Sequence, residues 1–251
     1  MRKIPVWPTL ATVGNLVCGF SALAAVAGGN LERAAWLIII AMLFDAADGR
    51  LARITRTATE FGGQLDSLAD VVSFGCAPAF MTHYYTMKCL PEFSEKLAWT
   101  ASGLFVICAA MRLARFNVEN TSDQTSHRAF KGLPSPGAAG LLAAAVILLQ
   151  DYRESLHPAV VGLLPLIEVA AAVLMVTRIR YPHILSRLDL GEMPFSFLLL
   201  VIFLGMLVAI EPQIGLFILF AVYAASGPIG LTIDQVLERV AAASDSEDSL
   251  F

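Results

Sequence analysis

The chain has 251 residues, of which 57% are hydrophobic and only 15% charged, and its mean hydropathy is +0.70. Soluble domains carry about 25% charged residues, so this composition excludes an ordinary water-soluble domain and predicts a protein that crosses a membrane several times. The formal net charge of −4 says little about partners because the charges are segregated along the chain, and no nucleic-acid partner is expected.

Apolar runs of about 17–25 residues, the length that spans a bilayer, predict an all-α membrane fold of about eight transmembrane helices. In chain order the expected helices are Thr9–Gly28, Leu31–Gly49, Asp66–Met87, Leu97–Phe116, Pro136–Leu149, Pro158–Val176, Pro194–Ile210 and Ile214–Ile229. The fifth is short, and polar residues and Pro78 interrupt the third and fourth. Only Glu211, Pro212 and Gln213 join the last two, which predicts a tight hairpin with no loop exposed to lipid.

The positions of the basic residues predict which helix ends face the cytoplasm. If the N-terminus is cytoplasmic, most of the 17 basic residues fall on the cytoplasmic side, and only Arg33, Lys88, Lys96 and Arg153 fall on the other. This asymmetry favours cytoplasmic N- and C-termini. A cleavable signal peptide is the alternative for the N-terminus, but the proline and polar residues within the first apolar run disfavour it.

We therefore expect an integral membrane domain over residues 1–230 and a cytoplasmic tail over residues 231–251. Within the tail, TIDQVLERVAAA is expected to form a short amphipathic helix, whereas the acidic end SDSEDSLF is expected to be disordered.

Four aspartates lie where two apolar helices approach the cytoplasmic side. Asp45 and Asp48 are three residues apart, and Asp66 and Asp70 are four apart, so each pair shares one helix face. A loop of about a dozen residues, near Leu51 to Gly63, would bring the two faces together. Four carboxylates in a partly desolvated site cannot all remain ionised alone, so they either take up protons or bind a cation. All-oxygen ligands suit Mg²⁺, Mn²⁺ or Ca²⁺. Intramembrane carboxylates at this spacing favour a functional site over helix ends satisfied by water.

Small residues and one arginine surround these carboxylates. Gly49 and Ala52 flank the first pair, and Gly62 opens the helix that carries the second. Such residues let a ligand or another helix approach closely. Arg53 is placed to reach an anionic group bound by the metals, a combination that suits a diphosphate.

The complete string is D-x2-D-G-x2-A-R-x8-G-x3-D-x3-D, running without a gap from Asp45 to Asp70. It resembles the signature of the CDP-alcohol phosphatidyltransferase family. The resemblance implies a six-helix catalytic core, here about residues 8–180, followed by an extra helix pair at about 193–230. It also implies a homodimer, and two divalent ions (Mg²⁺ or Mn²⁺) held by all four aspartates, with Asp70 also the proposed base.

Further segments resemble the bacterial and archaeal members of this family that use serine. They are TVGNLVCGF (from Thr12), SLADVVSFGCAPA (from Ser67), MRLARFNV (from Met111) and FKGLPSPGAAG (from Phe130). One departure is visible, because relatives often have Pro-Asn where this chain has Pro8-Thr9. If that asparagine positions the diphosphate, Thr9 or Thr12 must serve instead.

A second group of polar residues follows on the fourth helix and the next loop. Arg112 and Arg115 share one face, Asn117 lies near them, and Lys131 comes in the following loop. A pocket that holds them beside the aspartates could receive the carboxylate of serine. The alternative is that the arginines only anchor the helix at the membrane surface.

These patterns together predict an integral membrane enzyme, in the bacterial inner membrane, with its active site on the cytoplasmic side. It would transfer the phosphatidyl group of CDP-diacylglycerol to the hydroxyl of L-serine, giving phosphatidylserine and CMP. CDP-lipid contacts are expected from Thr12, Gly49, Ala52, Arg53 and Gly62. The alternatives are the same chemistry with glycerol 3-phosphate or an inositol phosphate, or a cation transporter, although no internal repeat of the kind transporters show is evident.

Overall fold

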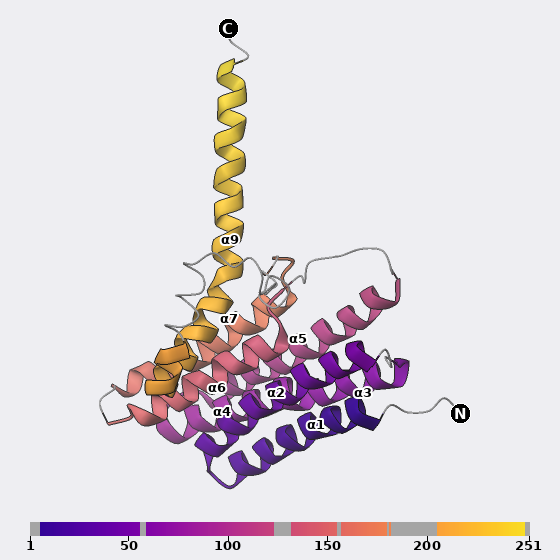
Figure 1. The fold of residues 1–251 in the computed structure, drawn as a ribbon. Helices are drawn as coiled ribbons and strands as arrows, with labels where there is room; N and C mark the ends of the chain where they lie inside the picture. Colours follow the sequence, from indigo (N-terminus) through magenta and orange to yellow (C-terminus); the bar gives the residue numbers. More distant parts are fainter. Residues whose placement is uncertain are drawn as a thin grey trace.

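The computed structural model describes residues 6–55, 59–122, 132–154, 157–179, 181 and 205–248, and all regular elements in these ranges are helical. Most of them lie side by side in one bundle (Figure 1). The elements are α1 (Val6–Ala27), α2 (Leu31–Thr55), α3 (Glu60–Asp70), the π-helical turn η1 (Val71–Cys76), α4 (Ala77–Cys89), α5 (Glu95–Ser122), α6 (Ser135–Asp151), the 3₁₀ turn η2 (Pro158–Leu163), α7 (Leu164–Val176) and α9 (Pro212–Asp248). The predicted all-α fold is confirmed.

A glycine and an asparagine connect α1 to α2. Gly29 has a φ of 77°, a conformation that glycine adopts at little cost, and this residue ends α1. The side chain of Asn30 then accepts a hydrogen bond from the Arg33 amide at 3.1 Å, which caps the start of α2. The two helices consequently run antiparallel and pack along their length.

The loop between the two aspartate pairs is shorter than the sequence suggested. α2 continues to Thr55, and α3 begins at Glu60 rather than at Asp66. The reason is a cap that the apolar pattern does not reveal, because Thr59 Oγ1 accepts a hydrogen bond from the Gly62 amide at 3.1 Å.

α3, η1 and α4 form one continuous helical segment with a wider turn in its middle. The π turn covers Val71–Cys76, directly after Asp70, and Pro78 lies in the first turn of α4. A proline lacks the amide that would continue the α-helical bonding, and a π turn accommodates this break. The interruption expected at Pro78 is therefore a local change of helix type.

α6 is the centre of the bundle. Most of its 17 residues are buried, chiefly alanine, leucine and glycine, which let the neighbouring helices approach closely. It is the short fifth helix that the sequence predicts. Larger side chains, among them Phe74, Tyr85 and Phe105, fill the core around it.

A buried glutamate joins three helices within the core. Glu168 on α7 is 1% exposed and accepts hydrogen bonds from Thr82 on α4 at 2.8 Å and from Ser102 on α5 at 3.3 Å. The sequence analysis did not single out this residue. Its position shows how α4, α5 and α7 are fixed to one another within the apolar core.

The expected hairpin near the C-terminus is present. Residues 205–210 are helical, Glu211 is the connection, and α9 begins at Pro212. A Cβ on Gly215 would lie 2.7 Å from the Val208 backbone, so the glycine allows the two helices to touch. Residues 194–204 of the expected seventh helix lie outside the described residues.

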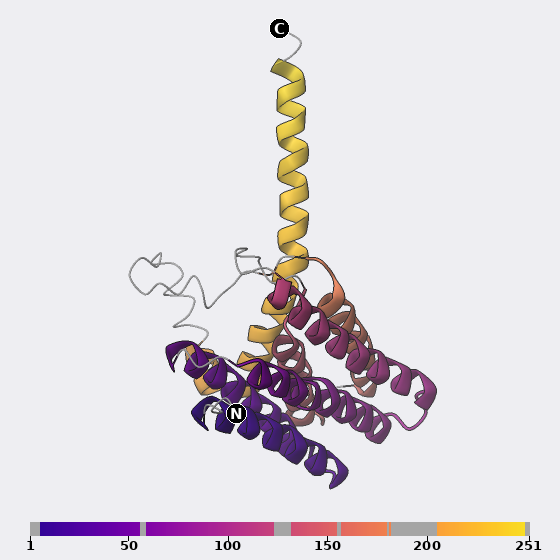
Figure 2. The same cartoon turned by 90° about the vertical axis from the view of Figure 1, so that its right-hand side faces the viewer.

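The predicted end of the last helix is wrong. α9 does not end near Ile229 but continues for 37 residues to Asp248, projecting away from the bundle (Figure 2). The short separate helix and the disordered acidic end are therefore replaced, as far as Asp248, by one helix. The segment TIDQVLERVAAA contains strong helix formers and no glycine or proline, so nothing in it ends α9.

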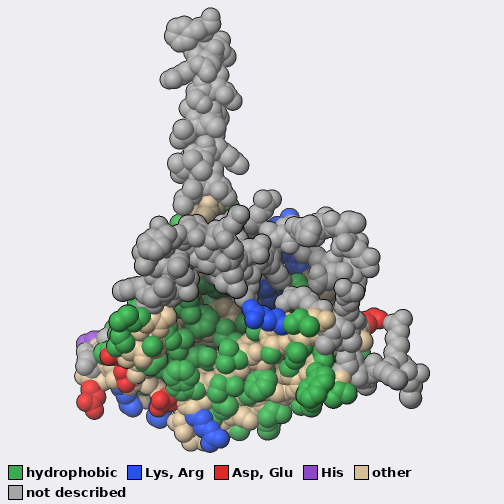
Figure 3. Space-filling view, viewed as in Figure 1, with side chains coloured by type: hydrophobic (Ala, Val, Ile, Leu, Met, Phe, Trp, Pro, Cys, Tyr) green, Lys and Arg blue, Asp and Glu red, His purple; other side chains and the backbone are tan. Residues whose placement is uncertain are grey.

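Four helices of the described chain are long and apolar enough to cross a membrane. They are Val6–Ala27, Glu95–Val118, Ala159–Val176 and Pro212–Thr232, and Ser135–Asp151 is a shorter apolar helix. Figure 3 shows broad patches of hydrophobic side chains on this face of the described bundle. The chain is an integral membrane protein.

Candidate active site

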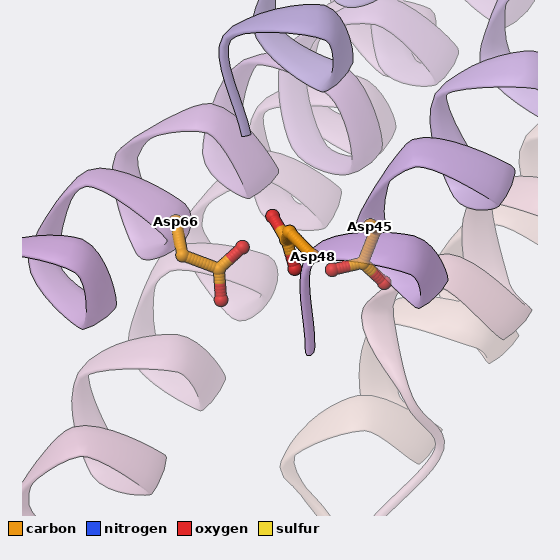
Figure 4. Close-up of side chains that lie close together, drawn as sticks. All are labelled: Asp45, Asp48 and Asp66. Atoms are coloured by element: carbon orange, nitrogen blue, oxygen red, sulfur yellow. The ribbon is translucent and has the colours of Figure 1, made fainter. Parts of the chain in front are cut away.

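Three aspartates converge at one end of the bundle. Oxygen atoms of Asp45, Asp48 and Asp66 all lie within 4.8 Å of one another. Figure 4 shows the carboxylates pointing together, the first two from α2 and the third from α3. The expected meeting of the two helix faces is therefore observed for these three residues.

Asp70 lies beside this group, one helical turn after Asp66. It is 6% exposed and close enough to Asp45 and Asp66 to interact with both electrostatically. Asn15 on α1 donates a hydrogen bond from Nδ2 to Asp70 Oδ1 at 3.0 Å. This contact fixes the carboxylate and leaves Oδ2 for another partner.

Thr12 lies one turn before Asn15 on the same face of α1. Its hydroxyl is 2.9 Å from Asp48 Oδ2 and 3.1 Å from the Pro8 carbonyl oxygen. The sequence analysis expected Thr12 to contact the CDP-lipid. In the structure it contacts an aspartate of the cluster and so orients a candidate metal ligand.

The cluster suits a divalent cation. Asp66 Oδ1 is buried and has no hydrogen-bond partner among the described residues, although a buried oxygen ordinarily has one. An ion bound by the three carboxylates would satisfy it, and an all-carboxylate donor set matches the preference of Mg²⁺ or Mn²⁺ for oxygen.

The small residues around the cluster have different surroundings. A Cβ added to Gly49, next to Asp48, would meet no atom within 4 Å, so open space adjoins the backbone there. Gly62 instead gives its amide to the Thr59 cap. Ala52 and Arg53 lie on α2, but their side chains are outside the described part of the chain.

Arg112 extends from α5 toward the aspartates. Its guanidinium interacts electrostatically with Asp70 and Asp45, and Nη1 donates a hydrogen bond to Ser135 Oγ at 3.0 Å. Ser135 is the first residue of α6 and fully buried. Of the four basic or polar residues expected in an acceptor pocket, Arg112 is thus placed beside the cluster.

The other three residues expected in the acceptor pocket, Asn117, Arg115 and Lys131, are not all placed beside the aspartates. Asn117 Nδ2 donates to Ser67 Oγ at 2.9 Å, which joins α5 to the helix that carries Asp66 and Asp70. Arg115 is half-buried on α5. Lys131 lies outside the described residues.

In the stretch FKGLPSPGAAG, Gly132 helps to fix where α6 begins. Gly132 has a φ of 89°, and a Cβ there would collide with the Met175 carbonyl oxygen, so only glycine fits. The Gly132 amide donates to the Ile179 carbonyl oxygen at 2.8 Å. These contacts fix the start of α6 and thereby the position of Ser135.

Sequence reasoning missed Asn15, Ser67 and Ser135 as site residues. All three lie in segments that were singled out by resemblance, but none has a spacing that indicates its partner. Each partner is distant in sequence, between 23 and 55 residues away. Only the packing of the helices reveals these pairs.

The chain matches a known protein family and several named relatives. The family model described as CDP-alcohol phosphatidyltransferase matches residues 5–177, which include all four aspartates. A Helicobacter pylori protein named CDP-diacylglycerol–serine O-phosphatidyltransferase is 35% identical over 229 residues, covering 88% of this chain and 92% of the relative.

Two relatives from distant organisms carry the same name. The Methanocaldococcus jannaschii protein is 34% identical over 183 residues, covering 72% of this chain and 76% of its own length. The Bacillus subtilis protein is 33% identical over 176 residues, covering 70% of this chain and 89% of its own length. The similarity thus extends to proteins of both bacteria and archaea.

Proposed function

Because the chain belongs to the CDP-alcohol phosphatidyltransferase family, an enzyme family that depends on divalent metals, we propose that it transfers the phosphatidyl group of CDP-diacylglycerol to L-serine. The products are phosphatidylserine and CMP. The observation that carries the proposal is the cluster of Asp45, Asp48 and Asp66 within the family-matched residues. The shared name of the relatives supports serine as the acceptor.

Two divalent ions, Mg²⁺ or Mn²⁺, would be held by Asp45, Asp48, Asp66 and Asp70 and would neutralise charge on the diphosphate. The open space at Gly49 admits the CDP portion beside α2. Arg53, one turn after Gly49, binds the diphosphate. Ala52 on α2 and Gly62 on α3 leave room for the nucleotide.

The serine hydroxyl oxygen attacks the phosphorus that bears diacylglycerol. The bond from this phosphorus to the bridging oxygen breaks, and CMP leaves. Asp70 accepts the hydroxyl proton at Oδ2, the oxygen that Asn15 does not bond. Arg112 binds the serine carboxylate, with Arg115, Asn117 and Lys131 as further candidates for the acceptor pocket.

An acceptor screen tests the proposal. The purified protein is given labelled CDP-diacylglycerol, Mg²⁺ or Mn²⁺, and in turn L-serine, glycerol 3-phosphate and inositol phosphate. We expect CMP release with L-serine, the acceptor in the shared name of the relatives, and little with the phosphorylated alcohols. Release that depends on another alcohol would overturn the choice of serine, and metal flux without CMP release would favour a transporter.

The metal site has its own test. Replacing Asp45 by alanine removes one of the three clustered carboxylates and should lower CMP release by at least about a hundredfold, because the metals carry most of the charge stabilisation. Unchanged CMP release from this variant would contradict the metal site.

The proposal includes the membrane location, orientation and oligomeric state of the enzyme. We place the active site and both termini on the cytoplasmic side of the bacterial inner membrane, in a homodimer. The catalytic core is residues 8–180, the additional helix pair is residues 193–230, and residues 231–251 extend into the cytoplasm. The distribution of the basic residues supports this orientation.

A further inference from the structure

α9 contains a proline close to the place where it leaves the bundle. Pro228 lies inside the helix, and Gly227 is the last buried residue among those of α9 whose burial the structure describes. Beyond this point α9 projects away from the other helices (Figure 2). A proline has no amide hydrogen, so the carbonyl oxygen four residues earlier, on Ala224, loses its usual partner within the helix. Ala224 is 5% exposed and lies in the apolar span of α9, so water does not replace that partner.

The hydroxyl of Tyr181 supplies the missing hydrogen bond. It donates to the Ala224 carbonyl oxygen at 3.0 Å. Tyr181 is 3% exposed and comes after the end of α7, so the donor belongs to a part of the chain distant from α9 in sequence. Gly227 allows the ring to come this close, because a Cβ there would collide with it. The proline, the glycine before it and the tyrosine are therefore complementary.

The residues around Pro228 make this part of α9 easy to bend. Gly227 and Gly230 flank the proline, and glycine is a poor helix former. Ser226 Oγ donates to the Tyr223 carbonyl oxygen at 2.7 Å, a contact within the helix that competes with its regular bonding. Prolines and adjacent Gly and Ser residues are the usual sites of helix kinks. The direction of α9 beyond this segment therefore depends on contacts from outside the helix.

The two halves of α9 differ in what holds them. Before the proline, two aromatic rings pack on glycines of α6: a Cβ on Gly137 would lie 2.8 Å from the ring of Tyr223, and a Cβ on Gly140 would collide with Phe220. After the proline, no residue whose burial is described is buried. Tyr181 makes its contact at the boundary between these halves.

We infer that Pro228 is a hinge in α9 and that the Tyr181 hydroxyl is the latch that holds this hinge in one direction. While the hydroxyl bonds to Ala224, the carbonyl that the proline deprives of a partner is satisfied, and α9 keeps a single direction. Without that bond the carbonyl has to turn toward another donor, which rotates the helix beyond Pro228. The hinge is separate from the proposed reaction and does not depend on which alcohol is the acceptor.

A double-mutant cycle tests the latch. Tyr181→Phe removes only the hydroxyl, and we expect the thermal midpoint in detergent to fall by about 2–4 °C, the shift for one lost buried hydrogen bond in a chain of this size. Pro228→Ala restores an amide that can donate to the Ala224 carbonyl. In that background Tyr181→Phe should lower the midpoint by less than about 1 °C. Tyr84→Phe is the control, since its hydroxyl makes no hydrogen bond among the described residues, and its midpoint should not change.

The outcomes of the cycle are distinct. Equal shifts from Tyr181→Phe in the two backgrounds would overturn the inference, because a tyrosine that only fills space would not depend on the residue at position 228. If Tyr181→Phe alone does not fold, folding of the double variant with Pro228→Ala would support the latch, and failure of both would overturn it.

Two glycines give an independent check. Gly227→Ala should displace the Tyr181 ring and lower the thermal midpoint, although alanine is the better helix former. Gly230→Ala is the matched control, because its Cβ would meet no atom within 4 Å, and its midpoint should be unchanged or higher. A midpoint of Gly227→Ala equal to that of Gly230→Ala would contradict the close fit of the ring.

The direction of α9 can be measured with spin labels at Glu60→Cys and Glu238→Cys in a parent without native cysteines. Labelled protein is diluted with unlabelled protein, so that only distances within one chain are recorded. We expect one narrow distance distribution for the parent, a distribution at least about twofold broader with Tyr181→Phe, and a narrow one again when Pro228→Ala is added. Equal widths with and without the Tyr181 hydroxyl would show that it does not hold the hinge.

Discussion

α1 contributes no carboxylate to the aspartate cluster, yet two of its side chains position carboxylates of the site. Thr12 and Asn15 lie three residues apart on one face of α1, and they contact Asp48 and Asp70 respectively. Residues that orient metal ligands affect a site nearly as much as the ligands themselves. The sequence identified the aspartates by their spacing, but the partner of a polar residue on another helix depends on packing that no spacing encodes.

Thr12→Val should weaken metal binding. The substitution keeps the shape of the side chain but removes the hydroxyl that contacts Asp48. We expect the Mg²⁺ or Mn²⁺ concentration for half-maximal CMP release to rise about tenfold. Thr12→Ser retains the hydroxyl and serves as the control, so equal metal dependence of the two variants would contradict the role assigned to Thr12.

Asp70→Asn tests the proton acceptor. The amide is nearly isosteric with the carboxylate but cannot take the serine proton, and general bases contribute about 10²–10⁴-fold in rate. We expect kcat to fall within that range in the CMP-release assay, at saturating metal. Near-normal turnover would exclude Asp70 as the base and leave it only a binding role.

At the scale of elements, the π turn η1 connects the site to the core. It begins directly after Asp70, and its Ser73 donates a hydrogen bond to the Asn15 carbonyl oxygen at 3.0 Å. Gly19, one turn further along α1, lies against the same serine, where a Cβ would collide with its hydroxyl. The close approach of α1 and η1 therefore keeps Asn15 within reach of Asp70.

Gly19→Ala should separate α1 from η1. The added methyl group would also lie 2.7 Å from the Ser73 backbone, so a side-chain rotation cannot relieve the contact. Overpacking of this kind costs about 1–3 kcal/mol of stability, and we expect kcat to fall as the Asn15 contact lengthens. Gly103→Ala on α5 is the control, because its Cβ would meet no atom within 4 Å, and activity equal to that of this control would contradict the argument.

The link between α4, α5 and α7 makes a second prediction at this scale. Glu168→Ala would remove the acceptor of both hydroxyls: Thr82 would keep its bond to the Ala79 carbonyl oxygen at 3.0 Å, whereas the buried Ser102 hydroxyl would lose Glu168, at a cost of about 1–3 kcal/mol. We expect a lower thermal midpoint in detergent and a smaller loss for Glu168→Gln, which retains an acceptor oxygen. Equal midpoints for the alanine variant and the unaltered protein would show that the three helices do not depend on this residue.

At the scale of the whole molecule, hydrophobic length and spacing predict most of the fold. The expected helices that fall within the described residues are present, and the C-terminal hairpin is tighter than expected, because Glu211 alone joins its helices where the sequence predicted three residues. Helix ends were predicted less well, because a cap such as Thr59 is a local hydrogen bond that hydropathy does not record. The continuation of α9 to Asp248 was missed for a related reason, since a helix continues past the apolar segment wherever no residue ends it.

Orientation in the membrane is a property of the whole chain, and the basic residues predict it. The connection between α4 and α5 should face away from the cytoplasm, whereas the start of α3 and the end of α9 should face it. Single cysteines at Glu92, Glu60 and Asp248 would report these three positions once the native cysteines are replaced. The native cysteines are Cys18, Cys76, Cys89 and Cys108, all unpaired.

In intact bacterial spheroplasts, a membrane-impermeant maleimide should label Glu92→Cys and spare Glu60→Cys and Asp248→Cys until the membrane is permeabilised. Glu92 and Glu60 are both exposed, so a difference in labelling would report the side of the membrane and not burial. CMP release by the cysteine-free parent confirms that the chain is folded. Labelling of Glu60→Cys before permeabilisation would place the aspartate cluster on the outer side, away from cytoplasmic CDP-linked substrates, and would contradict the proposed orientation.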